Sequence, residues 1–205
     1  MVKIKICGLQ TKDDISYANI LKPDYIGFVF LQGRRRYIDP EKAAHLRKLL
    51  NPSIQCVGVF VDEPIENVIS LLENGTIQLA QLHGHEDEAY AKKLKELCGK
   101  PIIKAFIIKN EDDVKKALAY DCDYLLLDNG LGTGETFDWS LIQNIDKPFF
   151  LAGGLTPENV REAITLTQPF AVDTSSGVET DCRKDYNKIK AFIDAVRTGN
   201  IFEFE

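Results

Sequence analysis

The chain has 205 residues, of which 44% are hydrophobic and 27% charged, a composition typical of a globular protein with one sizeable core. Its net charge of -6 argues against a nucleic-acid or acidic-membrane surface, although backbone N–H groups and a local arginine can hold a small anion. Five widely spaced cysteines without a CxxC pair argue against a disulfide framework or a zinc site, and no apolar run has the length of a signal peptide or membrane span, so a cytoplasmic protein is expected.

Short apolar runs alternate with longer amphipathic stretches along the whole chain. The runs are Lys3–Cys7, Tyr25–Phe30, Ile54–Val61, Ile77–Leu82, Ile102–Ile107, Tyr124–Leu127, Pro148–Leu151 and Phe170–Val172. Their nearly continuous apolarity is typical of strands buried on both faces of a parallel sheet. Eight such units predict an α/β protein, a single (β/α)8 TIM-barrel domain over residues 1–205. The alternative, a doubly wound open sheet, normally has fewer strands and often a glycine-rich dinucleotide turn, and no GxGxxG follows the first run.

The stretches between the runs carry helical signals. Helix starts are predicted where a capping side chain precedes a proline or acidic residues, at Asp39-Pro40-Glu41, Asn110-Glu111-Asp112-Asp113 and Thr156-Pro157-Glu158. Apolar side chains repeat at helical spacing in two stretches. They are Tyr90, Leu94, Leu97 and Cys98 within Glu86–Cys98, and Tyr186, Ile189, Ile193 and Val196 near the carboxyl terminus.

Small residues follow the last two predicted strands. Gly153 and Gly154 follow the seventh, and Ser175, Ser176 and Gly177 follow the eighth. Small residues let backbone N–H groups approach an anion, and these two loops are the usual phosphate grip of a TIM barrel, often with a short extra helix. A lone Gly-Gly pair would be read as a tight turn, but two such loops at these strands predict a phosphorylated small-molecule ligand.

Cys7 ends the first predicted strand. A free cysteine is commonly a small buried apolar residue. At the carboxyl end of a barrel strand, where active sites of this fold are built, its thiolate can instead act as a base if nearby positive charge lowers the pKa of the thiol. Lys5 points to the same side of the strand, so it could supply that charge or be a layer residue inside the barrel.

Asp128 ends the sixth predicted strand. It is either a cap or turn residue, or a carboxyl in a mostly apolar mouth that keeps a proton and donates it. Because Cys7 and Asp128 lie on different strands, they could act on opposite faces of one substrate. Such an acid–base pair needs no metal and no cofactor, and the sequence has no HExxH or comparable ligand cluster.

Further polar residues follow the second, third and fourth predicted strands. Arg34, Arg35 and Arg36 form either a solvated basic loop or a fork for a substrate carboxylate. His83 is assigned to substrate binding or to hydrogen-bonding support at the rim, and Asp62 to such support alone.

A set of short segments, in this order and spacing, resembles the N-(5'-phosphoribosyl)anthranilate isomerase family of tryptophan biosynthesis. The segments are Lys5-Ile6-Cys7-Gly8, Gly27-Phe28-Val29-Phe30, Arg36-Tyr37-Ile38, Val57-Gly58-Val59-Phe60-Val61, Gln81-Leu82-His83-Gly84, Leu126-Leu127-Asp128, Gly132-Thr133-Gly134, Phe137-Asp138-Trp139, Leu151-Ala152-Gly153-Gly154-Leu155 and Ser175-Ser176-Gly177-Val178-Glu179. Each is weak alone, but the set spans nearly the whole chain and is highly specific.

The resemblance implies an aldose–ketose isomerase without a cofactor. Its reaction would be the Amadori rearrangement of N-(5'-phosphoribosyl)anthranilate to 1-(2-carboxyphenylamino)-1-deoxyribulose 5-phosphate. The resemblance implies that Cys7 is the base that takes the proton from the sugar C2', that Asp128 is the acid that protonates the ring oxygen, and that Arg36 binds the anthranilate carboxylate. Because the family contains monomers and dimers, a monomer or a homodimer is expected.

The chain departs from the family pattern at three places. The loop Leu31–Arg36 lacks the usual prolines, Leu131 interrupts a GGTG motif, and Thr174 stands where an apolar residue is more common. Two alternative functions stay open. Another sugar-phosphate barrel would use an aspartate at Cys7 (the histidine-pathway isomerase) or unmatched lysines and glutamates (indole-glycerol-phosphate synthase), and a non-catalytic phosphate-ligand sensor would need neither Cys7 nor Asp128.

Overall fold

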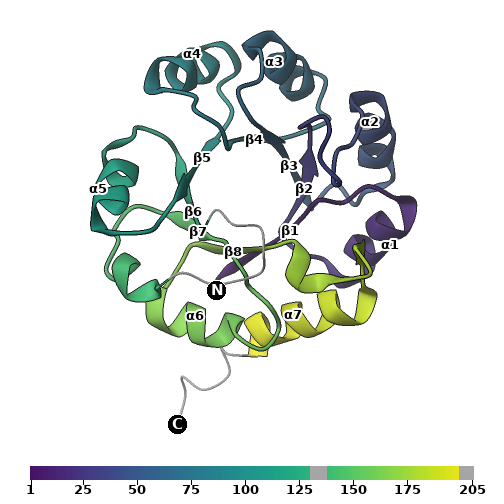
Figure 1. The fold of residues 1–205 in the computed structure, drawn as a ribbon. Helices are drawn as coiled ribbons and strands as arrows, with labels where there is room; N and C mark the ends of the chain where they lie inside the picture. Colours follow the sequence, from purple (N-terminus) through teal and green to yellow (C-terminus); the bar gives the residue numbers. More distant parts are fainter. Residues whose placement is uncertain (130–137, 199–205) are drawn as a thin grey trace.

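The structure, a computed structural model, describes residues 1–129 and 138–198. Eight parallel strands form a closed barrel in sequence order, with β8 paired to β1 (Figure 1). The strands are β1 (Lys3–Cys7), β2 (Tyr25–Val29), β3 (Gln55–Phe60), β4 (Leu79–Leu82), β5 (Ile102–Ile107), β6 (Tyr124–Asp128), β7 (Phe149–Leu151) and β8 (Ala171–Thr174). The predicted TIM barrel is confirmed, and each strand end lies within two residues of its predicted position.

Helices surround the barrel (Figure 1). They are α1 (Lys12–Leu21), α2 (Pro40–Leu49), α3 (Ile65–Glu73), α4 (Glu88–Cys98), α5 (Glu111–Ala119), α6 (Val160–Thr167) and α7 (Tyr186–Thr198). Between β6 and β7 the described residues form only a short 3-10 helix, η1 (Trp139–Ile142). A second 3-10 helix, η2 (Ser176–Val178), and a hairpin of β9 (Glu179–Thr180) and β10 (Arg183–Lys184) lie between β8 and α7. None of the helices described is both long and apolar enough to span a membrane.

Two of the predicted helix starts are confirmed by their caps, and the third is displaced by one turn. The side chain of Asp39 accepts a hydrogen bond from the N–H of Glu41, and Asn110 caps α5 in the same way. Residues 157–159 form a turn instead of the first turn of a helix, and α6 begins at Val160. Thr156 still acts as a local cap, because its Oγ1 accepts a hydrogen bond from the N–H of Glu158.

Helix α4 begins two residues after its predicted start because Glu86 is used elsewhere. Its carboxylate accepts hydrogen bonds from Lys104 Nζ at 2.8 Å and from the backbone N–H groups of Asp62 and Gly84, so Asp87 becomes the cap. The predicted buried face of α4 is wrong at Leu97, because this side chain is 56% exposed.

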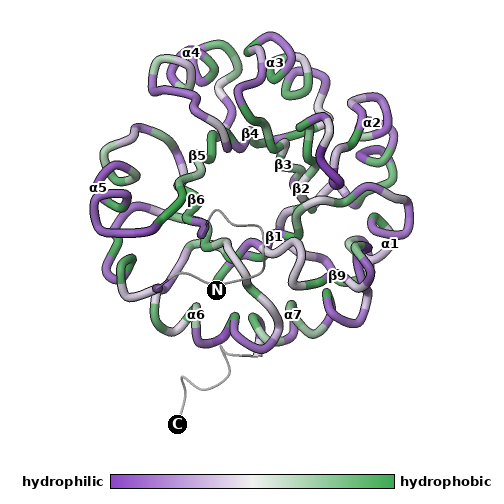
Figure 2. The backbone as a smooth tube through the Cα atoms, in the orientation of Figure 1, coloured by the Kyte–Doolittle hydropathy of each residue, from purple (hydrophilic) through white to green (hydrophobic). Residues whose placement is uncertain are grey.

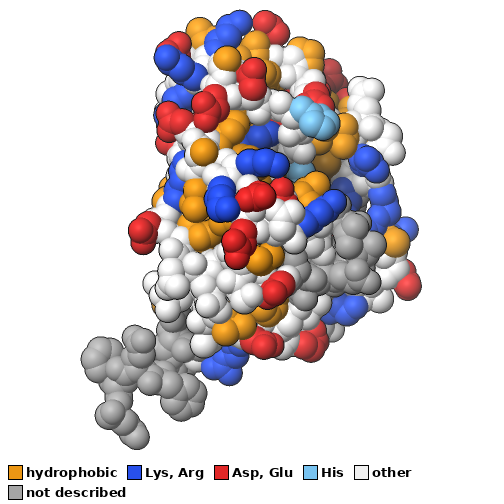
Figure 3. Space-filling view, turned by 60° about the vertical axis from the view of Figure 1, so that its left-hand side comes forward, with side chains coloured by type: hydrophobic (Ala, Val, Ile, Leu, Met, Phe, Trp, Pro, Cys, Tyr) orange, Lys and Arg blue, Asp and Glu red, His pale blue; other side chains and the backbone are white. Residues whose placement is uncertain are grey.

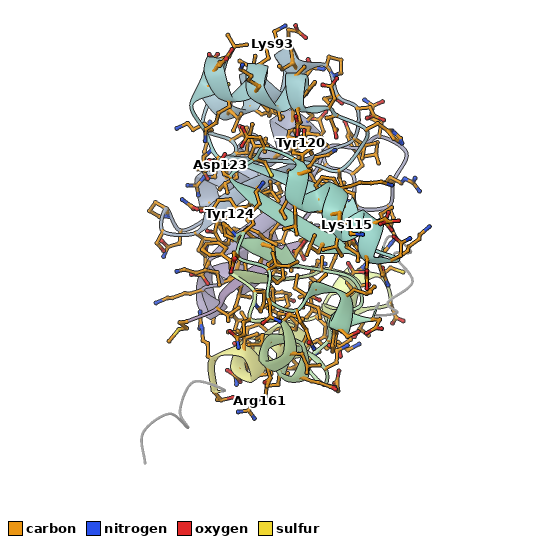
Figure 4. The ribbon with its side chains drawn as sticks, turned by 90° about the vertical axis from the view of Figure 1, so that its left-hand side faces the viewer. Lys93, Lys115, Tyr120, Asp123, Tyr124 and Arg161 are labelled. Atoms are coloured by element: carbon orange, nitrogen blue, oxygen red, sulfur yellow. The ribbon has the colours of Figure 1, made fainter. Side chains whose placement is uncertain are left out.

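The apolar residues form two clusters, one on each side of the strands. The larger lies between strands and helices, and Figure 2 shows hydrophobic strands inside helices whose hydrophobic and hydrophilic stretches alternate. The smaller fills the barrel interior and consists of Tyr25, Val57, Leu79, Ile103, Ala105, Leu126, Phe150, Ala152 and Ala171. Tyr124, labelled in Figure 4 at the start of β6, packs against this cluster together with Phe170. Aromatic rings near the strand starts therefore fill the amino-terminal part of the barrel.

Charged side chains of both signs are interspersed on the molecular face in Figure 3. In the view of Figure 4, the labelled basic side chains Lys93, Lys115 and Arg161 lie on α4, α5 and α6. Because side chains of a strand point alternately inward and outward, the helices cover one set and the other set faces the barrel axis. The inward positions nearest the strand ends are the ones that can build a site.

Candidate active site

A cavity of about 420 Å³ lies at the carboxyl ends of the strands. All the residues that the sequence assigns to the site line it, namely Cys7, Arg36, His83, Asp128, Gly153, Gly154, Ser175, Ser176 and Gly177. Asp62 does not line the cavity. Its carboxylate accepts a hydrogen bond from the N–H of His85 and lies 3.0 Å from Nδ1 of that ring, so it supports the turn after β4 at the rim.

The Cys7 thiol is buried beside a glycine. Cys7 pairs with Gly27 across β1 and β2, and a Cβ placed on Gly27 would lie only 2.6 Å from Cys7 Sγ. Burial raises the pKa of the Cys7 thiol, and the positive charges of Lys5 and Lys184 oppose that rise without cancelling it. The thiol is therefore mostly protonated at neutral pH.

Lys5 combines the two roles that the sequence left open. Its side chain is fully buried inside the barrel, and its Nζ donates a hydrogen bond of 2.8 Å to Asp173 Oδ2, across the pairing of β1 with β8. Its charge also favours the Cys7 thiolate. Burial raises the pKa of Asp173, and the charge of Lys5 opposes this rise.

Asp128 faces an imidazole whose proton position is set by a neighbour. Asp128 Oδ2 lies 3.9 Å from His83 Nε2, and Gln81 Nε2 lies 3.0 Å from His83 Nδ1. An amide nitrogen can only donate, so this contact assigns the imidazole proton to Nε2, the nitrogen nearer Asp128. Burial lowers the pKa of His83 and Asp128 opposes the change, so the ring is neutral at pH 7.

The two loops predicted to bind phosphate are packed against each other, and the loop after β7 also packs against Asp128. A Cβ on Gly153, whose φ is +85°, would lie 3.0 Å from Asp128 Oδ1, and one on Gly177 would lie 2.0 Å from the carbonyl oxygen of Leu155. Thr174 explains its own departure from the family pattern, because its hydroxyl donates a 2.7 Å hydrogen bond to that same carbonyl. The expected short helix after β8 is η2, and the first N–H groups of any helix lack intrahelical partners.

Arg36 is held rigidly although its loop lacks prolines. The amide of Gln10 donates to the carbonyl oxygens of Arg35 and Tyr37, which fixes the loop on both sides of Arg36. Arg36 Nε and Nη2 donate to the two carboxylate oxygens of Glu179 at 2.8 and 3.0 Å. Arg34 and Arg35 also line the cavity, so the arginine run belongs to the site.

Several residues of the site have no individual role in the sequence prediction. Asp173 Oδ1 and Gln81 Oε1 are buried and have no hydrogen-bond partner among the described residues, and both side chains line the cavity. Alternation could have found them, because Gln81 lies two residues before His83 and Asp173 two before Ser175. The predicted segment Gly132-Thr133-Gly134, with Leu131 and Phe137, lies outside the described residues.

Comparisons with known proteins extend over nearly the whole chain. The sequence model of the family described as N-(5'phosphoribosyl)anthranilate (PRA) isomerase matches residues 4–195. A relative from Endomicrobium trichonymphae, named N-(5'-phosphoribosyl)anthranilate isomerase, is 47% identical over 203 residues, which cover 97% of this chain and 100% of the relative. A relative of the same name from Thermoanaerobacter pseudethanolicus is 43% identical over 204 residues, with 96% and 98% covered.

Solved structures give the same assignment. Phosphoribosyl anthranilate isomerase from Thermotoga maritima has a TM-score of 0.90 and 40% identity, over 97% of this chain and 100% of that one. A crystal structure of phosphoribosyl anthranilate isomerase in complex with reduced 1-(o-carboxyphenylamino)-1-deoxyribulose 5-phosphate has a TM-score of 0.87 at the same identity and coverage. With a family match over most of its length and relatives above 40% identity, this chain belongs to the N-(5'-phosphoribosyl)anthranilate isomerase family.

Proposed function

We propose that the chain isomerises N-(5'-phosphoribosyl)anthranilate to 1-(2-carboxyphenylamino)-1-deoxyribulose 5-phosphate in tryptophan biosynthesis. The observation that supports this most is one shared cavity, which Cys7, Asp128 and Arg36 line together with the small residues after β7 and β8. The substrate has a carboxylate at one end, a phosphate at the other and the reacting sugar between them. A base and an acid from different strands, together with an arginine and the small-residue loops in the same cavity, supply one binding or reacting group for each of these parts.

The two anionic ends of the substrate are bound by different means. The backbone N–H groups of the loops that contain Gly153, Gly154, Ser175, Ser176 and Gly177 bind the phosphate. The guanidinium of Arg36 binds the anthranilate carboxylate. The buried oxygens Gln81 Oε1 and Asp173 Oδ1 accept hydrogen bonds from sugar hydroxyls, which are the donors the ligand offers there.

The first chemical step opens the sugar ring. Asp128 gives a proton to the ring oxygen, the bond from C1' to that oxygen breaks, and the nitrogen lone pair forms a Schiff base at C1'. The carboxylate that remains on Asp128 faces the Nε2–H of His83, which stabilises the new negative charge. His83 therefore supports Asp128 as a neutral donor within the same cavity.

The second step moves a proton from carbon. The Cys7 thiolate removes the proton from C2', and the electrons of that C–H bond form a double bond between C2' and C1' as the nitrogen becomes neutral. The resulting enol then tautomerises: the C2' hydroxyl loses its proton as the ketone forms, and C1' gains one proton, so the step is neutral in protons. Because the Schiff base withdraws electrons, a weakly populated thiolate is a sufficient base.

The requirement for a reduced thiol also bears on where the protein acts. Cys7 must be free to serve as the base, and a reducing compartment keeps thiols free, so we propose the cytoplasm. The residues assigned to the site line one cavity within a single barrel, and we propose a monomer or a homodimer. A dimeric relative from Thermotoga maritima has been obtained as monomers.

The function and the two roles are tested by turnover. N-(5'-phosphoribosyl)anthranilate is generated in situ, because it is labile, and the loss of anthranilate-type fluorescence is followed. We expect wild-type turnover, no turnover by Asp128→Asn, and a kcat of Cys7→Ser lowered by roughly 100- to 10,000-fold. The matched controls Cys98→Ser and Asp121→Asn lie outside the cavity and keep wild-type kcat. An inactive wild type would disprove the function, and near-wild-type kcat in both site variants would disprove the mechanism alone.

A further inference from the structure

One carboxylate, that of Glu179, is surrounded by three cationic side chains beside the cavity. Its Oε1 accepts hydrogen bonds of 2.8 Å from Arg36 Nε and 2.8 Å from Lys184 Nζ. Its Oε2 accepts from Arg36 Nη2 at 3.0 Å and from Arg35 Nη2 at 2.7 Å. The side chains of Glu179 and Lys184 are only 7% and 2% exposed, so this is a built cluster and not a surface ion pair.

The fold brings these four residues together from two places in the chain. Glu179 and Lys184 are cross-strand partners in the hairpin of β9 and β10. The arginines come from the loop between β2 and α2, which Gln10 holds in place. Lys184 Nζ also donates a 2.8 Å hydrogen bond to the carbonyl oxygen of Ser175. The cluster therefore lies between the loop that carries Arg36 and the loop after β8.

Glu179 is ionised over the whole working range of pH. Burial alone would raise the pKa of its carboxyl, but hydrogen bonds and charge from Arg36, Lys184 and Arg35 lower it to about 2. Three cations against one carboxylate leave an excess of positive charge, which favours the arrival of further anions.

Glu179 binds one two-nitrogen edge of the Arg36 guanidinium, and a second edge is left for another ligand. Nε and Nη2 form a bidentate pair with the carboxylate, which fixes the plane of the group. A guanidinium has a second two-nitrogen edge, formed by Nη1 and Nη2, that fits another carboxylate in the same way. Arg36 Nη1 has no hydrogen bond to any described residue, and Arg36 lines the cavity.

We infer that Glu179 is a positioning residue, which holds one edge of the Arg36 guanidinium so that the other edge binds the anthranilate carboxylate. This inference rests on the proposed function. A long arginine side chain loses rotamer entropy when it is fixed, and Glu179 makes that loss part of folding and not of substrate binding. Glu179 thus sets how strongly the enzyme selects a substrate that carries the carboxylate.

The test replaces the carboxylate of Glu179 with an uncharged amide of nearly the same shape. In Glu179→Gln we expect KM for N-(5'-phosphoribosyl)anthranilate to rise on the order of tenfold while kcat stays within about twofold, the pattern of lost ground-state binding. In an Arg36→Met background the same substitution should change kcat/KM by less than about twofold, because there is no guanidinium left to orient. Glu179→Asp, which is one methylene too short for the bidentate pair, should resemble Glu179→Gln.

Inorganic phosphate, used as a competitive inhibitor, separates positioning from a merely structural role. Because Lys184 keeps its contact with Ser175, the inhibition constant for phosphate should stay within about twofold in Glu179→Gln. Thr180→Ala, which removes an exposed hydrogen bond to Asp185 in the same hairpin, is the matched control and should keep wild-type KM.

Two results would overturn the inference while leaving the proposed function intact. One is a tenfold rise of KM that persists in the Arg36→Met background. The other is an inhibition constant for phosphate that rises in step with KM, which would mean that the whole mouth has loosened. If Glu179→Gln does not fold, the same measurements on Glu179→Asp decide. An inactive wild type would instead refute the proposed function.

Discussion

Cys7 and Asp128 each have a glycine beside them where any side chain would collide. Gly27 leaves the space for the Cys7 thiol on β1, and Gly153 lets the loop after β7 approach Asp128. A side chain at either glycine would therefore displace the proposed base or the proposed acid. A displacement near 1 Å of a catalytic group can cost on the order of 100-fold in rate.

Gly27→Ala should therefore impair catalysis while sparing binding. The new methyl group would lie 2.6 Å from Cys7 Sγ, so the thiol must shift. We expect kcat to fall on the order of 100-fold with KM little changed. The control is Gly75→Ala, where no atom lies within 4 Å and the φ of +77° costs stability alone. Retention of wild-type kcat by Gly27→Ala would show that the thiol position is not critical.

The raised pKa of Cys7 predicts the pH dependence of its thiol. A base works only when deprotonated, and burial raises the pKa of this thiol above its ordinary value of 9.0. The thiolate is therefore lost as pH falls, and the rate at which a thiol-selective alkylating reagent modifies Cys7 should rise steadily from about pH 7 to about pH 9. Cys7→Ser identifies the modification that belongs to this residue. A modification rate of Cys7 that stays flat over this range would show that its pKa is not raised.

At the residue scale, strand-end polar residues were predictable and cross-loop partners were not. Cys7, His83 and Asp128 end apolar runs, and a parallel barrel brings all strand ends to one mouth. Glu179 and Lys184 lie in a hairpin beyond η2, and the contact of Glu179 with Arg36 joins residues that are 143 positions apart. No spacing rule reaches that far, although Glu179 ends a segment that resembles the family.

Among the elements, β1 and β8 close the barrel and share its buried ion pair. Lys5 and Asp173 face each other across this seam at 2.8 Å, with both side chains nearly or fully buried. Removing one member of such a pair leaves an uncompensated buried charge, which typically costs roughly 3–5 kcal/mol. One ion pair therefore both stabilises the closed barrel and borders the cavity, which Asp173 lines.

Lys5→Met should lower the stability of the whole barrel. We expect the free energy of unfolding to fall by roughly 3–5 kcal/mol, measured as the urea midpoint at neutral pH. The double variant Lys5→Met/Asp173→Asn should recover a large part of the loss, because no buried charge is left without a partner. An unchanged midpoint in the single variant would mean that the ion pair contributes nothing to closure.

Element existence was easier to predict from the sequence than element bounds. Continuous apolarity located every strand of the barrel but not the β9–β10 hairpin. Asp39 and Asn110 located two helix starts, because capping signals are local. The start of α6 was misplaced, since Thr156 makes its hydrogen bond within a turn that precedes the helix. Glu86 was wrongly predicted to begin a helix. Its buried pairing with Lys104 depends on tertiary structure, which no local sequence signal shows.

At the scale of the whole molecule, the protein is acidic, but arginine side chains gather at its cavity. The chain has a net charge of -6, yet Arg34, Arg35 and Arg36 line the cavity and Lys184 lies beside it. Local positive charge inside a cleft attracts anions whatever the net charge of the protein. A substrate with two anionic ends fits this distribution, and its orientation follows from where the arginine and the small-residue loops lie.

The most direct test of that orientation is a crystal structure of this chain with reduced 1-(o-carboxyphenylamino)-1-deoxyribulose 5-phosphate, the ligand of the structural relative. We predict its phosphate at the loops after β7 and β8, its carboxylate on Arg36, and its sugar carbons between Cys7 Sγ and the Asp128 carboxyl. A reversed ligand, or one whose sugar lies out of reach of either Cys7 or Asp128, would contradict the account.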